Sequence, residues 1–351
     1  MLTKNINAET PCFQLILFAL FFCGCAASDQ SVKPQVFVFS DINIDQGDPD
    51  DRQSLVHLLW YANELDIRGI VPDRWNAQGM EASQLVVDAY ALDYEQYDFA
   101  KKEYPAPQQI RNLLASNTDD ALTRFGQAAR EASAENPLYV LVWGNMQNVG
   151  KALRAHAEHV DHLRLVTIGT GLKYGPKDEV AGENCEEPNW NGPGRNKIFQ
   201  DNRFDDMWWL EINWTYNGMF SGNEPKEMFD TLSTFGNMGN HLKFVTKNQE
   251  WAQYFRVGDT PSVLYIIDPG HDKEDPTQSS WAGKFKKPFL EKRPNYYTDD
   301  NGPVAWNYSD PCQTWHELQS MYAYNKSTLE AERPEMYDAL LAKLDTLYQN
   351  P

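Results

Sequence analysis

Cysteine is scarce in this chain of 351 residues. Five cysteines are present, and three of them, Cys12, Cys23 and Cys25, fall near the N-terminus, which leaves Cys185 and Cys312 in the body. Neither of these two has a C-x-x-C partner, so a thiolate metal cluster is excluded. A single disulfide between them in an oxidising compartment stays open, because sequence alone does not give its geometry.

Positive charge is also in short supply. Lysine and arginine together number 31 against 50 aspartates and glutamates, which gives a formal net charge of −19. Such a field repels a phosphate backbone and therefore argues against nucleic acid as a partner. Hydrophobic residues make up 42% and aromatic residues 13% of the chain, enough apolar surface to bury a large core rather than remain disordered.

Long apolar runs are lacking as well. The apolar stretch at residues 13–22 is too short to span a bilayer, but it suits the apolar region of a secretory signal peptide. The sequence FFCGC that follows resembles a loose bacterial lipobox with Cys25 as the acylated residue, and cleavage near Ala27 is the alternative. We therefore predict a leader over residues 1–27 and export to the periplasm or cell surface of a bacterium. A lipid anchor, left open, is the one expected link to a membrane.

Strand-like and helical patterns alternate over the first half of the chain. The expected strands cover residues 35–40, 66–72, 138–144 and 163–169. The expected helices begin near Asp50 and cover residues 81–97, 121–134 and 147–160. This alternation with short connections predicts the α/β class, with a mostly parallel central sheet and helices on both faces. No linker composition divides the rest, so residues 31–351 are predicted to form a single domain with long loops in its second half.

Five aspartates fall within eleven residues directly after the first expected strand: Asp41, Asp45, Asp48, Asp50 and Asp51. In a parallel α/β sheet, ligands gather beyond the carboxyl ends of the strands. Carboxylates packed together repel one another unless a cation compensates, and a hard cation such as Ca²⁺ prefers oxygen ligands. A calcium site is therefore favoured over a solvated loop. An EF-hand is disfavoured, because no glutamate stands at the twelfth position counted from Asp41.

The segment VFSDINIDQGDPDDRQSLVHLLWYANELDIRGIV resembles the N-terminal motif of the nucleoside hydrolase superfamily, in which D-x-D-x-x-x-D-D follows the first strand. It is closer still to the nucleoside hydrolase-like domain of bacterial proteins labelled cellulose-binding, the DUF1593 group. Three later segments fit the same family in matching order: LVWGNMQNVGKAL, WWLEINW and VGDTPSVLYII. The resemblance runs from about Val36 to about Phe289.

The resemblance implies hydrolysis of an N- or O-glycosidic bond at a ribose-like sugar, with Ca²⁺ as the cofactor. The metal ligands that it implies are Asp51, the backbone carbonyl of Gln147, and Asp259. The residues that it implies for binding the sugar hydroxyls are Asp50, Glu211 and Asn213.

The family's catalytic base has no direct counterpart in this chain. Counted from the strand, the base aligns with Asn43, and counted back from the Asp50–Asp51 pair it aligns with Gln46. Asp41 matches the first aspartate of the motif, and the loop that follows is three residues longer than usual. The catalytic candidates are therefore Asp41 itself and the two carboxylates able to move into the vacant place, Asp45 and Asp48.

Aromatic residues and a histidine add further candidates for substrate binding. Trp75 follows the second expected strand and Trp281 lies in a polar loop, so both are expected to stack on a ligand, whereas Trp143 and Trp208 are expected in the core. His271 stands beside Asp272 in another polar stretch, which is a candidate source of a general acid for the leaving group. Simple exposure in a loop is the alternative for this histidine.

Together these patterns predict an exported, calcium-dependent hydrolase of N- or O-glycosidic bonds. Its expected partner is a small-molecule sugar or nucleoside, with an oligosaccharide also open. One alternative is a non-catalytic carbohydrate-binding protein that keeps the fold and the metal site. Another is a metal-stabilised structural domain without turnover. A homo-oligomer is left open, because no interface is legible in the sequence.

Overall fold

The three-dimensional structure is a computed structural model that describes residues 1, 32–44, 47–170, 194–244, 246–305 and 315–349. The chain divides into Met1–Val32 and a larger unit, Lys33–Pro351, and everything below concerns the larger unit. Asp45, the two body cysteines and nearly all of the expected leader lie outside the described residues, so their predictions stay predictions.

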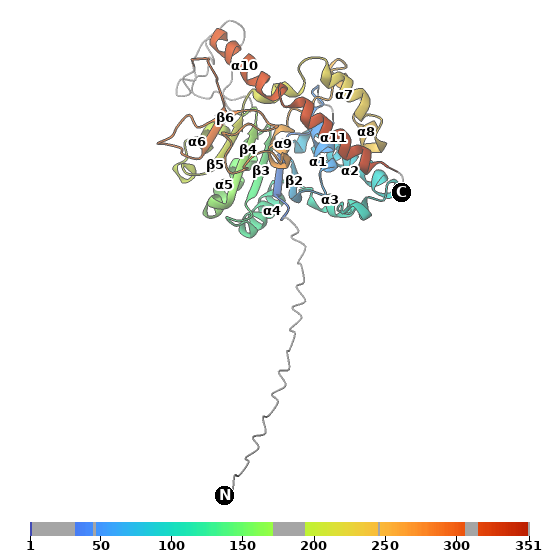
Figure 1. The fold of residues 1–351 in the computed structure, drawn as a ribbon, viewed down its shortest axis with the longest axis horizontal. Helices are drawn as coiled ribbons and strands as arrows, with labels where there is room; N and C mark the ends of the chain where they lie inside the picture. Colours follow the sequence, from blue (N-terminus) through green and yellow to red (C-terminus); the bar gives the residue numbers. More distant parts are fainter. Residues whose placement is uncertain (2–31, 45–46, 171–193, 245, 306–314, 350–351) are drawn as a thin grey trace. The chain divides into compact units, whose positions relative to one another are not determined.

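A sheet of seven described strands forms the centre of this unit (Figure 1), in the order β2-β1-β3-β4-β5-β7-β6. The strands are β1 (Gln35–Ser40), β2 (Asp66–Pro72), β3 (Leu138–Trp143), β4 (Leu163–Ile168), β5 (Trp208–Ile212), β6 (Phe285–Lys286) and β7 (Tyr296–Asp299). All neighbouring strands pair in parallel except the short β6, which is antiparallel to β7. The predicted α/β class with a mostly parallel sheet is confirmed.

Both faces of the sheet are buried, which explains why its strands are continuous apolar runs. Successive side chains of a strand point to opposite faces. In β1, Val36 and Val38 belong to one core cluster, whereas Phe37 and Phe39 belong to a second. All six residues of β1 are buried, as expected of a parallel strand covered on both sides.

Helices and short 3-10 turns connect the strands. The described α-helices are α1 (Asp50–Trp60), α2 (Gly79–Gln96), α3 (Pro107–Leu113), α4 (Thr118–Glu131), α5 (Gln147–Ala155), α6 (Gly194–Phe199), α7 (Glu224–Leu232), α8 (Gly236–His241), α9 (Pro261–Ile267), α10 (Trp315–Glu330) and α11 (Arg333–Leu347). The 3-10 turns are η1 (Trp75–Ala77), η2 (Phe99–Lys102), η3 (Ala157–His162), η4 (Asn202–Phe204), η5 (Thr215–Met219) and η6 (Trp251–Gln253). Helices α1, α2, α9 and α11 contribute to the first core cluster, and α4, α5 and α6 to the second. Among the described residues, no helix combines the length and the apolar character needed to cross a membrane.

The expected helices differ from the observed ones mainly at their ends. Helix α4 begins at Thr118, three residues before the expected start, because the Asn117 side chain accepts a hydrogen bond from the Asp120 N–H and caps the helix. The helix expected over 147–160 ends at Ala155, and η3 continues the chain towards β4.

Helix α1 directly follows the aspartate-rich loop and enters the core. Its N-cap is Pro49, and Asp50 and Asp51 occupy its first turn, where carboxylates interact favourably with the helix dipole. Every residue from Asp51 to Trp60 is buried, so the helix is enclosed on all sides rather than lying on the surface. The fold thereby draws the Asp51 carboxylate into the interior and leaves Asp50 half-buried beside it.

Tyr348, just after α11, ties the C-terminal helix to three other helices. Its hydroxyl donates to Asp93 Oδ2 of α2 at 2.7 Å and accepts from Trp60 Nε1 of α1 at 3.1 Å. Asp93 also accepts the backbone N–H groups of Asn237 and Met238, at 2.6 and 2.8 Å, and so holds the first turn of α8. One hydroxyl therefore joins elements that are far apart in the sequence.

We expect Tyr348→Phe to destabilise the protein by about 1–3 kcal/mol, because the buried indole N–H of Trp60 loses its acceptor. Equilibrium urea unfolding measures this change. Tyr97→Phe is the matched control, since the Tyr97 hydroxyl accepts from Gln96 at the surface, and a change within about 0.5 kcal/mol is expected there. Equal losses in the two variants would contradict the role given to Tyr348.

Candidate functional site

The carboxyl ends of the central strands bring a set of polar residues to one edge of the sheet. Ser40, the last residue of β1, is in register with Pro72 of β2 and with Trp143 of β3. The residues that follow, Asp41 and Asp73, therefore leave neighbouring strands at the same level. Hydrogen bonds fix this level, since the Asp41 N–H donates to Trp143 O at 3.1 Å and the Asp73 N–H donates to Ser40 O at 2.7 Å.

Three carboxylates meet at this edge and form what we call the aspartate triad: Asp50, Asp51 and Asp259. One oxygen from each lies within 4.8 Å of the others. Asp51 and Asp259 are 2% and 5% exposed. Asp259 precedes α9, and its carbonyl accepts both the N–H and the Oγ–H of Ser262, at 3.1 and 2.7 Å. The fold thus brings together two residues of one helix start and one residue more than 200 positions later.

The electrostatics of the triad favour a cation. Burial raises the pKa of all three carboxyls well above the ordinary value of 3.8, and nearby carboxylates raise it further. The Ser40 hydroxyl, which donates to Asp51 Oδ1 at 2.5 Å, opposes this shift. Asp259 Oδ2 is buried and has no hydrogen-bond partner among the described residues. A hard divalent cation fits this set, because it takes carboxylate oxygens and removes their repulsion.

Two glycines let the backbone pass close to these carboxylates. A Cβ atom at Gly258 would lie 2.9 Å from Asp50 Oδ2, and one at Gly144 would lie 2.9 Å from Asp41 Cγ. Gly144 also has φ +95°, a conformation that L-residues rarely adopt. Larger residues at these two positions would push the carboxylates out of place.

Arginines hold both of the described catalytic candidates. Arg74, which follows Asp73, pairs with Asp41 through Nε and a terminal nitrogen. Arg256 grips Asp48 with two hydrogen bonds of 2.7 and 3.0 Å. The Arg256 guanidinium also lies 3.9 Å from the ring centres of Phe220 and of Trp251, between two aromatic faces. Each of the two carboxylates thus already has a positively charged partner.

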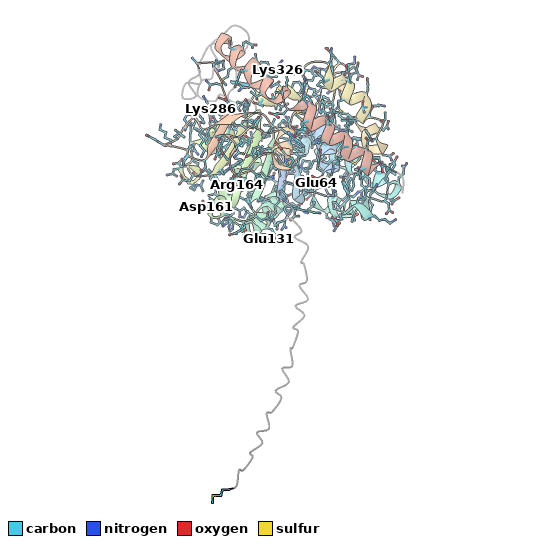
Figure 2. The ribbon with its side chains drawn as sticks, in the orientation of Figure 1. Glu64, Glu131, Asp161, Arg164, Lys286 and Lys326 are labelled. Carbon is cyan, nitrogen blue, oxygen red and sulfur yellow. The ribbon has the colours of Figure 1, made fainter. Side chains whose placement is uncertain are left out.

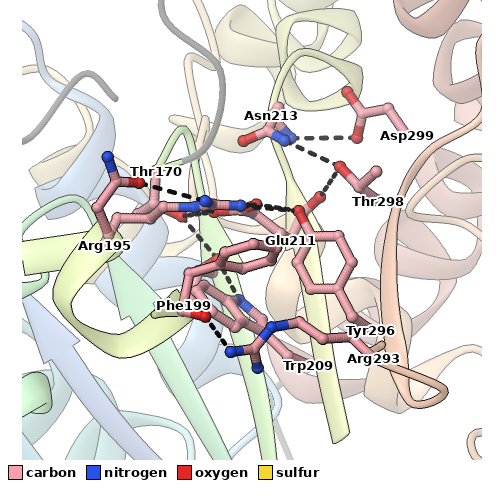
Figure 3. Close-up of polar contacts among 12 residues, drawn as sticks. Thr170, Arg195, Phe199, Trp209, Glu211, Asn213, Arg293, Tyr296, Thr298 and Asp299 are labelled. Carbon is pink, nitrogen blue, oxygen red and sulfur yellow. Dashed lines mark hydrogen bonds and ion pairs between the residues drawn. The ribbon is translucent and has the colours of Figure 1, made fainter. Parts of the chain in front are cut away.

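Glu211, expected to contact sugar hydroxyls, lies in a buried network (Figure 3). Arg195 donates to its two oxygens at 2.9 and 2.7 Å, and the Tyr296 hydroxyl and Thr170 Oγ1 donate as well. The side chain is fully buried. Burial lowers the pKa of Arg195, but the Glu211 carboxylate more than compensates and leaves it above its ordinary value. Glu211 is thus held by protein groups, and its role in substrate binding stays a prediction.

Asn213 lies next to a second buried carboxylate, Asp299, which the sequence pattern did not single out. The Asn213 side chain donates to Thr298 Oγ1 at 2.9 Å. Asp299 accepts the backbone N–H groups of Asn213, Trp214 and Thr215 at 3.1, 2.6 and 3.1 Å. Burial raises the pKa of Asp299 to about 6 despite these bonds. This carboxylate fixes the turn after β5, and the ligand contact predicted for Asn213 stays a prediction.

Gln147 and Trp75 are placed at the same edge of the sheet. Gln147 is the first residue of α5, its N–H donates to Asn145 Oδ1 at 2.8 Å, and its side chain is exposed. Trp75 opens η1 directly after Arg74 and is partly buried against the second core cluster. These positions do not test whether the Gln147 carbonyl binds a metal or whether Trp75 stacks on a ligand, so both stay predictions.

The side chains of His271 and Trp281 are both buried, and for Trp281 this requires a correction. The imidazole of His271 is fully buried, 3.3 Å from Asp268 Oδ2 and with its ring 4.6 Å from that of Tyr265. Tyr265 packs on Trp208, the first residue of β5, so His271 lies at the edge where the strands begin. The position of Glu274, three residues after His271, supports this placement, because Glu274 pairs with Arg164 near the start of β4. Figure 2 labels Arg164.

His271 therefore lies near the end of the strands opposite to the triad, and its expected contact with a ligand stays a prediction. Trp281 is only 6% exposed, and its N–H donates to Asp268 Oδ2 at 2.8 Å, so it belongs to the core rather than to a binding surface. Trp143 and Trp208 are buried as expected.

Sequence reasoning missed Asp73, Arg74 and Arg256 at this edge. The signal for Asp73 and Arg74 was present, since they follow the second strand just as Asp41 follows the first. Arg256 had no such signal, because its pairing with Asp48 depends on how two distant loops meet.

A family model described as "Cellulose-binding Sde182, nucleoside hydrolase-like domain" matches residues 35–285. Among solved structures, the chain is similar to a nucleoside hydrolase-related hypothetical protein from Saccharophagus degradans that is associated with carbohydrate metabolism. The identity is 14%, the match covers 91% of this chain and 73% of that chain, and the TM-score is 0.58. This likeness shows a shared fold.

An inosine-uridine preferring nucleoside hydrolase from Bacillus anthracis is also similar, with 12% identity over 84% of this chain and 99% of that chain, and a TM-score of 0.44. A search of curated proteins finds no significant match.

We expect Asp259→Asn to stabilise the metal-free protein at pH 8. Because the folded-state pKa of Asp259 is raised, its contribution to stability is complete below the ordinary value of 3.8 and is lost as the pH rises through the raised value. At pH 8 the amide removes a repulsion on the order of 1–4 kcal/mol, the value for two charges about 4 Å apart. Urea unfolding in EDTA at pH 8 and pH 4.5 measures the gain over the wild type, which should shrink at the lower pH.

The matched control is Asp268→Asn. Asp268 is a buried carboxylate outside the triad that accepts the N–H groups of Gly270 and Trp281, so its replacement should lower stability. Burial lowers the pKa of His57 to about 3 and that of His241 to about 4. Because each variant is compared with the wild type at the same pH, the contribution of these histidines to stability is the same in both and cancels. Equal stability of Asp259→Asn and the wild type at pH 8 would contradict a charge-strained triad.

Proposed function

Because the chain belongs to the cellulose-binding Sde182 nucleoside hydrolase-like family, we propose that it is a calcium-dependent hydrolase of N- or O-glycosidic bonds. The proposed substrate is a nucleoside-like molecule or a carbohydrate. The observation that carries the proposal is the aspartate triad, buried at the carboxyl edge of a parallel sheet, where ligands of α/β proteins bind.

Asp51 and Asp259, with Asp50 beside them, are the residues that would hold the ion. Bound Ca²⁺ supplies a fixed positive charge that orients sugar hydroxyls and a water molecule. The chain's own groups do the rest. The Asp50 carboxylate accepts hydrogen bonds from sugar hydroxyls, and the surrounding carboxylates stabilise the positive charge that develops on the sugar ring as the glycosidic bond breaks.

The substrate class draws on what the similar proteins are. The family description names cellulose binding, and the Saccharophagus degradans protein is associated with carbohydrate metabolism. The family description also names a nucleoside hydrolase-like domain. These descriptions support a sugar or a ribonucleoside as the ligand of this chain, with an oligosaccharide included among the candidates.

A second candidate function is carbohydrate binding without turnover. Two observations favour it: Asn43 stands where the family has its base, and Asp41 and Asp48 are both held by arginines. Under this alternative the triad still binds calcium, but the bound sugar remains intact.

Export and homo-oligomerisation are further proposals. Export rests on the apolar stretch at residues 13–22 and the small residues after it. Size-exclusion chromatography with light scattering, and fractionation of the host cell, test these two points independently of the site.

The central experiment is an activity panel for the wild-type protein. It contains p-nitrophenyl ribofuranoside, the common ribonucleosides, and p-nitrophenyl and reducing oligosaccharides, each assayed with Ca²⁺, with EDTA, and with Ca²⁺ restored after EDTA. We expect cleavage of at least one class, loss in EDTA, and recovery with calcium. Binding of a sugar by calorimetry without cleavage of any substrate would favour the second candidate instead.

We expect Asp51→Asn to weaken calcium binding by at least about 100-fold, because the number of charged ligands sets calcium affinity over several decades. Isothermal calorimetry on EDTA-treated protein measures the affinity directly. Asp66→Asn is the control, since Asp66 lies at the opposite end of β2 and pairs with Arg68 at the surface. Normal calcium affinity in Asp51→Asn would show that the site assignment is wrong.

A further inference from the structure

Most carboxylates at the carboxyl edge of the sheet are already engaged. Asp41 and Asp48 are paired with Arg74 and Arg256. The triad carboxylates crowd together where a cation fits. The proton acceptor sought for the attacking water is a carboxylate that is neither paired with an arginine nor used to hold the metal.

Asp73 meets this requirement among the described residues. It follows β2 directly, and only 7% of its surface is exposed. Its Oδ1 accepts a hydrogen bond from Asn148 Nδ2, and Asn148 Oδ1 in turn accepts from Lys151 Nζ at 2.9 Å. Its Oδ2 is buried and has no hydrogen-bond partner in the described part of the chain. One oxygen is thus anchored while the other is left for a water molecule or a substrate group.

Ser40 connects Asp73 to the triad. The Ser40 carbonyl accepts the Asp73 N–H at 2.7 Å, and the Ser40 hydroxyl donates to Asp51 at 2.5 Å. Arg74, the next residue after Asp73, reaches Asp41, and Asp41, Asp51 and Asp73 all raise its pKa, against the lowering effect of burial. These contacts place Asp73 one strand away from the residues that would hold the ion.

We propose that Asp73 is the proton acceptor for the attacking water and that Asn148 orients its carboxylate. Asp73 thereby takes the role of the family's base, at whose place in the loop after β1 this chain has Asn43. The proposal rests on the proposed function, since it assigns a residue to that reaction. A base with one oxygen fixed by a neighbouring side chain and the other directed at the reacting group is the arrangement that general-base catalysis requires.

The reaction step balances with water as the single co-reactant. The Asp73 carboxylate takes one proton from water while the water oxygen forms a bond to the anomeric carbon. The glycosidic bond breaks, and its electron pair leaves with the aglycone, which takes up a proton from solvent. Asp73 then returns its proton to solvent, so one water is added across one glycosidic bond.

The charged and polar groups around Asp73 set the pH at which it can act. They come from three elements: Asp41 after β1, Arg74 in its own loop, and Asn148 and Lys151 on α5. Burial raises the pKa of Asp73 to about 6 and Asp41 adds to the rise, whereas the Asn148 hydrogen bond, Lys151 and Arg74 oppose it. Activity should therefore decline on the acid side as this carboxylate takes up a proton.

The test compares the wild type, Asp73→Asn and the control Asp66→Asn on whichever panel substrate the wild type cleaves. We expect kcat of Asp73→Asn to fall by at least about 100-fold, the usual contribution of a general base. Calcium affinity by calorimetry should stay within about 3-fold of the wild type, because a lost metal ligand would change it by decades. Asp66→Asn should keep both values. Partial recovery of the rate of Asp73→Ala with formate or azide would identify a missing proton acceptor.

Asn148→Ala provides a second, milder variant in case Asp73 variants fail to fold. Loss of the Asn148 side chain removes a hydrogen bond that lowers the pKa of Asp73, so the acid limb of the pH profile of kcat/KM should move to higher pH. An unmoved acid limb, or full kcat in Asp73→Asn, would overturn the role of Asp73 while leaving the proposed hydrolysis in place. A wild-type protein that cleaves no substrate of the panel would overturn the proposed function and this role together.

Discussion

Like-charge repulsion among buried carboxylates is the constraint on which this structure depends. Three aspartate oxygens lie within 4.8 Å of one another, and two of these aspartates, Asp51 and Asp259, are buried while Asp50 is half-buried. The fold cannot relieve this strain by exposing Asp51, because α1 carries it into the core with ten consecutive buried residues. Nor can it move Asp259, whose carbonyl is fixed by Ser262, itself bonded to Trp143 of β3 at 2.8 Å. The packing that stabilises the domain therefore holds the negative charges together, and a bound cation would compensate them.

Arginines form ion pairs with several other carboxylates at the carboxyl edge of the sheet. Arg74 neutralises Asp41, Arg256 neutralises Asp48, and Arg195 neutralises Glu211. Two of these arginines are also stacked on aromatic rings, Arg256 between Phe220 and Trp251 and Arg195 over Phe199, which fixes their direction as well as their charge. The carboxylates described here at this edge without an arginine partner are then the triad, Asp73, and Asp299, which backbone N–H groups hold. This division separates carboxylates that shape the site from those that are available for chemistry.

Much of the fold was predictable because burial on both faces leaves a continuous apolar run in each parallel strand. The residues of β1 and β2 coincide with the predicted ranges. The gathering of Asp50, Asp51 and Asp259 followed from a motif resemblance, since no local pattern links positions so far apart in the sequence. Polar loops were the weak point. Composition placed His271 and Trp281 at a ligand, yet both side chains are buried, because a loop rich in charge still folds its few large rings inward. The partners of Glu211 and Asp299 were equally invisible, since each depends on side chains from other elements.

The position of Asp73 shows how a parallel sheet can tolerate a change in the loop after its first strand. Because β1 and β2 run in register up to Ser40 and Pro72, the residues that follow both strands emerge side by side, about 4.8 Å apart in the direction of strand pairing. A carboxylate lost from one loop can therefore be replaced from the neighbouring strand without moving the backbone. Such a replacement needs its own orienting partner, and Asn148 at the start of α5 supplies it. The longer loop between Asp41 and Asp50 is then free to present Asp48 to Arg256. Loss of a motif residue and loss of a function are consequently separate questions at an edge where several strands deliver side chains to the same space.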